Sequence, residues 1–130
     1  MKAQQSGFTL IELVMVIVIL GILAATAIPK FVDLSADARI AAVKGVAGSL
    51  ASASAINYAG CASKADVATA GICVAIANCT DISGLVNGFS GYTITAGALA
   101  TTGSTASCTL TDDADATVTA TFTGIGAGNG

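Results

Sequence analysis

The sequence predicts an α+β fold, in which a long N-terminal helix packs on a small antiparallel β-sheet. Three observations support this fold class. An apolar run of membrane-spanning length lies near the start, a helical stripe of apolar residues follows it, and the second half alternates threonine with apolar residues. These patterns divide the 130 residues into a leader (1–7), a transmembrane helix (8–29), an amphipathic helix (30–60) and a globular part with antiparallel strands (61–130).

The apolar run contains a single ionisable residue. Of the 21 residues from Phe8 to Ile28, only Glu12 can carry a charge. A helix rises about 1.5 Å per residue, so this run spans about 30 Å, the thickness of the hydrocarbon core of a bilayer. A charge within that core costs about 2.5–3.5 kcal/mol even on lenient insertion scales. We therefore expect Glu12 to have a partner of opposite charge.

The helical pattern continues beyond the apolar run. Apolar residues recur at three- and four-residue steps and end at a polar residue: Phe31, Leu34, Ala38, Ala42, Val46, Leu50, Ala53 and Asn57. This stripe predicts an amphipathic helix that ends near Gly60. Pro29, two turns after Gly21, predicts a kink or local melting of the helix. Gly45 and Gly48 are expected to pack against the strands or against neighbouring molecules.

Beyond the helix the sequence predicts short strands joined by turns. Three segments rich in threonine and β-branched residues predict antiparallel strands: Tyr92–Thr95, Ala106–Thr111 and Thr117–Phe122. The segment Asp112-Asp113-Ala114-Asp115 is expected to form the turn between the last two strands. A short helix over 81–86, capped by Thr80 or Asp81, precedes the strands, and a loose glycine-rich tail covers 124–130.

Composition argues against several functions. The net charge is −3 and the five basic residues are scattered, so no nucleic-acid site is evident. With no histidine, no serine or cysteine beside a plausible base and no phosphate-binding glycine motif, we expect neither an enzyme nor a cofactor. Asp112, Asp113 and Asp115 offer oxygen ligands for calcium, but the full spacing of a calcium loop is missing, so we favour a solvated turn.

Four cysteines follow the apolar run, at Cys61, Cys73, Cys79 and Cys108. An even number outside the membrane segment fits an oxidising periplasm and two disulfides. Three pairings are possible, and we favour Cys61 with Cys73 and Cys79 with Cys108. In a domain with no tryptophan and few other aromatic residues, each bridge stabilises the fold by about 3–4 kcal/mol. Zinc is the alternative, but without histidine or a C-x-x-C pair we expect no metal.

The N-terminal residues resemble those of the type IV pilins, the filament subunits of bacterial surface pili. The resemblance is specific over Gly7-Phe8-Thr9-Leu10-Ile11-Glu12-Leu13, extends through Pro29-Lys30-Phe31 and fades beyond the helix. Within the type IVa class, residues 16–23, 29–31 and 37–39 are most similar to the mannose-sensitive haemagglutinin-type pilins. The resemblance implies a ladle-shaped pilin fold and a structural role as a pilus subunit. That role includes surface adhesion, with twitching motility or DNA uptake as further activities.

The resemblance also implies the site residues. A membrane peptidase would cut between Gly7 and Phe8 and methylate the new amine of Phe8, and a residue without Cβ fits a narrow protease cleft. That amine and Glu12 are opposite charges in low-dielectric surroundings, so each lowers the desolvation cost of the other. We favour a pair between Glu12 and the Phe8 amine of an adjacent subunit. The alternatives are a pair within one chain, or a Glu12 side chain that reaches the membrane surface.

The implied partners are further copies of the chain, the prepilin peptidase and methylase, the pilus assembly platform and its ATPases. The protein would cross the bacterial inner membrane once before assembly and become part of an extracellular pilus afterwards. A minor pilin or a type II secretion pseudopilin is one alternative. A periplasmic binding protein is another, with a signal peptide cut after Ala25-Thr26-Ala27. Glu12 near the start of the apolar region, with Lys2 the only basic residue before it, argues against the second.

Overall fold

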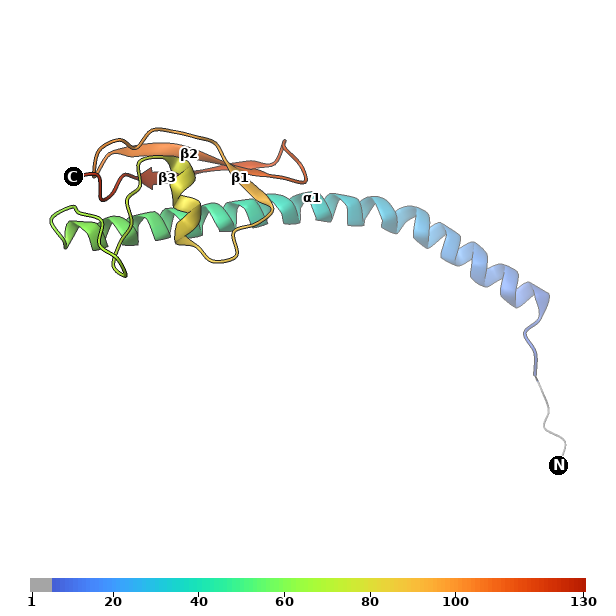
Figure 1. Ribbon diagram of the computed structural model, residues 1–130. Helices are drawn as coiled ribbons and strands as arrows, with labels where there is room; N and C mark the ends of the chain where they lie inside the picture. The colour runs from blue at the N-terminus through green and yellow to red at the C-terminus, as the bar shows by residue number, and fades with distance from the viewer. Residues whose placement is uncertain (1–5) are drawn as a thin grey trace, which may run out of the picture. The chain divides into compact units, whose positions relative to one another are not determined.

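The computed structural model describes residues 6–130, apart from the side chain of Val32, so residues 1–5 of the expected leader lie outside it. Five elements follow one another (Figure 1): helix α1 (Leu10–Ala62), the 3-10 helix η1 (Cys79–Leu85), and strands β1 (Tyr92–Ile94), β2 (Thr105–Asp112) and β3 (Thr119–Ile125). The strands form one antiparallel sheet in the order β1-β2-β3. The predicted fold class, one long helix packed on a small antiparallel sheet, is confirmed.

Helix α1 contributes to both compact units of the chain, of which the first ends at Asp37 and the second runs from Ala38 to Gly130. It is assigned as α-helix without a break through Gly21 and Pro29. Of the two predicted outcomes, local melting is therefore wrong, because a proline removes one backbone hydrogen bond without ending a helix that continues on both sides, whereas a kink stays a prediction. The helix also runs through Gly60 and ends at Ala62, slightly later than predicted.

The buried face of α1 differs from the predicted stripe. Six residues at three- and four-residue steps are buried: Val43, Ala47, Leu50, Ser54, Asn57 and Cys61. Only Leu50 and Asn57 belong to both sets. Phe31 and Leu34 are 71% and 66% exposed, and Ala42 is exposed as well. Hydropathy does not distinguish among the many alanines of this helix, whereas packing selects the face that carries Val43.

Two polar residues lie on that buried face because their hydrogen bonds are satisfied there. The Ser54 hydroxyl accepts a bond of 2.9 Å from the backbone N–H of Ile125, in β3. The Asn57 side-chain amide makes two hydrogen bonds to the backbone of Val74. It accepts from the Val74 N–H at 2.9 Å and donates to the Val74 carbonyl at 2.8 Å. A buried polar group that keeps its partners avoids the desolvation penalty. Asn57, expected to mark the end of the stripe, instead fixes the chain after the helix against α1.

The sheet contributes its inward-facing residues to the same core. Cys108 lies opposite Phe122, and Leu110 lies between Ile94 and Ala120. Ile94, Cys108, Leu110 and Phe122 are buried with Val43 and Leu50 of the helix. The third strand is displaced from its predicted range of 117–122 to Thr119–Ile125, since Thr117 belongs to the turn that precedes it.

Helix η1 begins with a different cap from the one predicted. The side chain of Asn78 accepts a hydrogen bond from the N–H of Thr80 at 3.3 Å. In return, the carboxylate of Asp81 accepts from the N–H of Asn78 at 2.9 Å. This is a reciprocal capping box with Asn78 as N-cap. The expectation that Thr80 or Asp81 caps the helix is therefore wrong by two or three residues.

The expected loose tail over 124–130 is wrong. Gly124 and Ile125 complete β3, and Ala127 is fully buried. Ala127 pairs with Ile76, whose N–H donates to the Ala127 carbonyl at 2.8 Å. The Asn129 side chain donates to the carbonyls of Ile76 and Leu99, at 2.6 and 3.1 Å. The glycines of this segment permit close backbone approach, which a composition-based prediction mistakes for disorder.

We expect Gly126→Ala to destabilise the second unit by about 1–3 kcal/mol, the usual range for overpacking. A Cβ at Gly126 would meet the backbone carbonyls of Thr101 and Leu99, the second at 2.7 Å, and the Ser104 hydroxyl at 2.8 Å. Gly45→Ala is the matched control, because its Cβ meets nothing within 4 Å. Alanine there stabilises the helix by about 0.5–1 kcal/mol. Urea unfolding of the full chain in detergent measures both, and equal midpoints would contradict the tight packing.

The expectation that Gly45 and Gly48 pack against the strands is wrong. A Cβ at Gly48, like one at Gly45, meets nothing within 4 Å, so neither glycine packs against the sheet. Of the two roles expected for these glycines, only contact with neighbouring molecules stays a prediction.

Candidate processing and assembly site

The predicted cleavage point lies just before the first turn of α1. Gly7 and Phe8 are outside regular secondary structure, and Phe8 is 91% exposed. A Cβ added at Gly7 would meet nothing within 4 Å, so no contact in the described structure requires a glycine there. The bond between the two residues is therefore accessible, and the expected requirement for glycine at position 7 does not arise from contacts within the described structure.

Glu12 closes a capping box with Thr9 at the start of the helix. Its Oε2 accepts hydrogen bonds from the Thr9 N–H at 2.9 Å and from the Thr9 hydroxyl at 3.0 Å. The Glu12 N–H donates to the Thr9 hydroxyl at 3.4 Å. This is the T-x-x-E form of the reciprocal cap, with Glu12 at the third helical position. Thr9 is a site residue that the interpretation above missed, although Thr9-Leu10-Ile11-Glu12 carries the signal in the sequence.

The cap directs the Glu12 carboxylate toward the N-terminal end of α1. Within residues 6–130, hydrogen bonds engage its Oε2 only, which leaves Oε1 as an acceptor for another donor. The start of a helix also attracts negative charge, because its first N–H groups are unpaired. Gly7, Phe8 and Glu12 thus lie at one helix end, where a positive group placed near Phe8 would meet a carboxylate.

The rest of the first unit presents apolar side chains to its surroundings. Between residues 8 and 31, all the large hydrophobic side chains are exposed. One stretch of 18 residues in α1 has a mean hydropathy of 2.7, and by length and composition the helix is able to cross a membrane. Small residues interrupt the apolar surface, at Gly21, Ala24, Ala25 and Ala27. Such a surface requires lipid or other apolar helices around it.

All four cysteines belong to the second unit, whereas the residues at the start of α1 belong to the first. The structure joins Cys61 to Cys73, with Cα atoms 5.4 Å apart, and Cys79 to Cys108, with Cα atoms 5.7 Å apart. These are the pairings favoured from the sequence. The first closes the loop after α1, and the second attaches η1 to the central strand β2.

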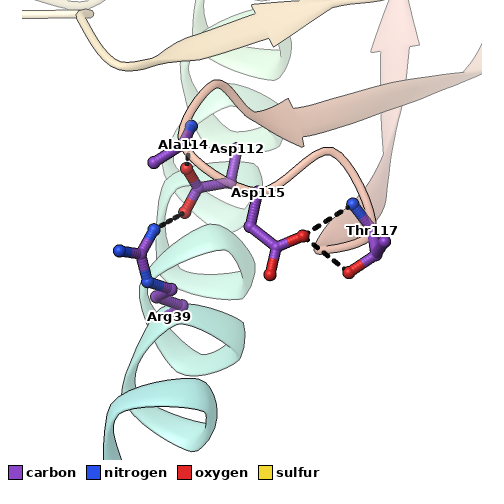
Figure 2. Close-up of polar contacts among 5 residues, drawn as sticks. All are labelled: Arg39, Asp112, Ala114, Asp115 and Thr117. Atoms are coloured by element: carbon purple, nitrogen blue, oxygen red, sulfur yellow. Dashed lines mark hydrogen bonds and ion pairs between the residues drawn. The ribbon is translucent and has the colours of Figure 1, made fainter.

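Each carboxylate of the acidic turn between β2 and β3 accepts a hydrogen bond, and Figure 2 shows those of Asp112 and Asp115. Asp112 accepts from the Ala114 N–H at 2.7 Å and lies 3.6 Å from the Arg39 guanidinium on α1. Asp113 accepts from the Thr93 hydroxyl. Asp115 accepts from the hydroxyl and the N–H of Thr117 at 2.7 and 3.0 Å, and these two bonds hold the pKa of Asp115 below its ordinary value.

These partners differ for the three carboxylates, which therefore serve the turn and its attachment to α1. Among residues 6–130, no group of three histidine, cysteine, aspartate or glutamate side chains is arranged to hold a metal ion. The calcium alternative therefore gains no support from this geometry.

Comparison with known proteins adds independent information about the N-terminal segment. Residues 2–28 match the model of the prokaryotic N-terminal methylation motif. The chain is 58% identical over 50 residues to the major component of the type IV narrow pilus of Thermus thermophilus, which is 38% of this chain and 43% of that protein. It is 55% identical over 40 residues to a type IV major pilin of Neisseria gonorrhoeae, covering 31% of this chain and 24% of that protein.

A secretion protein matches as well. The chain is 46% identical over 52 residues to the type II secretion system core protein G of Pseudomonas aeruginosa, covering 40% of this chain and 37% of that protein. The chain thus spans less than half the length of these relatives. No solved structure matches it.

Proposed function

We propose that this chain is the structural subunit of a type IV pilus filament, and the methylation motif over residues 2–28 and the similarity to type IV major pilins support this proposal. The observation that carries the proposal is the start of α1, where an exposed apolar helix holds one carboxylate toward its N-terminal end. Residues 8–29 would form the filament core, with 30–60 as the amphipathic continuation and 61–130 as the displayed part. The leader, residues 1–7, would be removed.

Assembly would move the apolar helix from the inner membrane into a bundle of identical helices. Lipid tails and apolar side chains are about equally hydrophobic, so this transfer gains little energy, and close packing must guide association. Gly21, Ala24 and Ala25 allow such close approach. The further element is charge: an amine on Phe8 of one subunit would pair with Glu12 of its neighbour, and each would offset the desolvation of the other. Such a pair would fix one register between helices.

The amine of that pair requires processing after Gly7. We propose that a prepilin peptidase cuts the exposed bond between Gly7 and Phe8 and that the new amine is then methylated. The matched methylation motif and the accessible position of the bond support this step. The remaining partners would be the pilus assembly platform and its ATPases. Surface adhesion is the proposed activity of the filament, with twitching motility or DNA uptake as further ones.

We expect the mature chain to begin with methylated Phe8, and Gly7→Leu to leave an uncut precursor in the membrane. A side chain at this position would obstruct the narrow cleft of the peptidase. Peptide mass analysis of the membrane-bound protein detects both species. Gly21→Leu is the matched control, since a Cβ at Gly21, like one at Gly7, meets nothing within 4 Å, and the position is far along the helix from the cleavage point. A mature chain that begins at Ile28 would show signal-peptide cleavage and contradict the proposal.

A second function is favoured by the similarity to the type II secretion core protein G. A secretion pseudopilin would use the same helix, the same cleavage and the same pairing of Glu12. The two functions differ in the filament found on the cell: a pilus subunit accumulates in long surface filaments that shearing removes, and a pseudopilin or a minor pilin does not.

A further inference from the structure

Hydroxylated side chains cover most of the outward face of the sheet. Outward positions alternate with the buried residues along β2 and β3. The outward positions are threonine or serine at 105, 107, 109 and 111 of β2 and at 119, 121 and 123 of β3, and the face ends at Ile125, which lies opposite Thr105. Thr93 and Thr95 continue the pattern on the side of β1, where the Thr93 hydroxyl donates to the Asp113 carboxylate. None of these positions carries an ionisable or aromatic side chain. The face therefore suits an uncharged ligand that is recognised through hydrogen bonds.

The hydroxyl groups are arranged in rows across the strands. Ser107 lies opposite Thr123, Thr109 opposite Thr121, and Thr111 opposite Thr119. The Cβ atoms of such opposite residues are about 4.5–5.5 Å apart, and neighbours on one face of a strand are about 6.6–6.8 Å apart. Because threonine is stiff at χ1, the hydroxyl positions are largely set before any ligand binds. The result is a two-dimensional array rather than a set of independent polar groups.

The hydroxyls of these three rows have no hydrogen-bond partner among the residues that the structure describes. Hydroxyls elsewhere in the chain donate to nearby backbone carbonyls, as Ser49 does to Gly45 at 3.0 Å and Ser83 does to Thr80 at 2.8 Å. Within residues 6–130, the six side chains of the three rows make no hydrogen bond to the protein. Both the donor and the acceptor capacity of the array are available to a ligand.

We propose that this face binds ice. A water molecule that joins two hydroxyls through bonds of about 2.7–2.8 Å at a tetrahedral angle spans about 4.5 Å. This span fits the separation of opposite residues on β2 and β3, so waters held between the strands reproduce the second-neighbour spacing of tetrahedral ice. None of the six residues in the three rows is charged, which matches an uncharged crystal surface. The proposal goes beyond the proposed function, and a filament would only add avidity by displaying many copies.

The test uses the processed full chain in fluorescently labelled lipid nanodiscs, together with a hemisphere of ice grown slowly from the solution. We expect wild-type discs to enter the ice and Thr121→Lys and Thr123→Lys discs to fall to the level of empty discs. Thr101→Lys, an exposed change of the same charge outside the array, retains wild-type uptake. Circular dichroism and the absence of free thiols show that each variant is folded.

Three results would overturn the proposal: uptake of wild-type discs no greater than that of empty discs, uptake by the folded lysine variants equal to the wild type, or binding of the wild type to microcrystalline cellulose without binding to ice. Sheared filaments serve as a second arm. If single copies in discs enter ice but no filaments form, the proposed function fails and the ice-binding face stands.

Discussion

We expect Glu12→Gln to leave the chain inserted in the membrane and cut after Gly7, while filaments are lost. Glutamine is less costly than an unpaired carboxylate inside a bilayer, so insertion should be at least as efficient as in the wild type. The Phe8 amine, however, would enter the filament without its counter-ion. An uncompensated buried charge costs about 3–5 kcal/mol, which is about two to four orders of magnitude in affinity for each subunit added.

Glu12→Gln removes the charge of residue 12 but keeps its capping box with Thr9. Glutamine at the third helical position also accepts from the N-cap N–H, so the bond from Thr9 is retained and the start of α1 is unchanged. The matched control is Asp33→Asn, which removes the same charge from an exposed position of the same helix. Processed protein in membranes and sheared filaments are quantified in parallel. A normal filament yield in the Glu12 variant would show that the pair is not essential, and failed insertion would point to a role in export.

Loss of the Cys79–Cys108 bridge should destabilise the second unit by about 2–5 kcal/mol. Both residues are in the core, with exposed fractions of 0% and 1%, and the bridge spans 29 residues of sequence. Replacing both cysteines with alanine avoids leaving a polar group buried. The free energy of unfolding in urea measures the loss. Labelling of unfolded, non-reduced wild-type protein with a thiol reagent should find no free cysteine.

The Cys61–Cys73 pair provides the control, because it spans only 12 residues. Loop-entropy arithmetic gives about 2.8 kcal/mol for the shorter loop and about 3.6 kcal/mol for the longer one. We therefore expect the double alanine variant of Cys61 and Cys73 to be the milder of the two. Two or more readily labelled thiols in the wild type would contradict the stabilisation by disulfides.

The sequence predicts the fold class well because its main features are local patterns. The apolar run and the three- and four-residue steps require a long helix, and threonine alternation requires strands. The periodicity did not identify the buried face of α1, since alanine appears on every side and packing against the sheet decides which residues are covered. Ser54 and Asn57 show the limit most clearly: their burial depends on the backbone of Ile125 and Val74, which only the folded chain brings near.

Non-local contacts also explain the error at the C-terminal end. The glycine-rich segment 124–130 has the composition of a loose tail, yet Ala127 and Asn129 are held by Ile76 and Leu99. At the candidate site, Glu12 is apparent from charge alone, because it is the one ionisable residue in an apolar run. Its cap by Thr9 was predictable from the T-x-x-E spacing. The pairing with a second molecule concerns an assembly, which one chain does not contain.

The most direct test of the proposed function is mass spectrometry of the main protein band of sheared surface filaments that have first been seen by electron microscopy. We predict that this band is the present chain, beginning with methylated Phe8 and keeping its apolar helix. Filaments whose main band is another protein would contradict the account and indicate a minor pilin or a pseudopilin. Recovery of the chain only as a periplasmic protein that begins at Ile28 would contradict its central claim altogether.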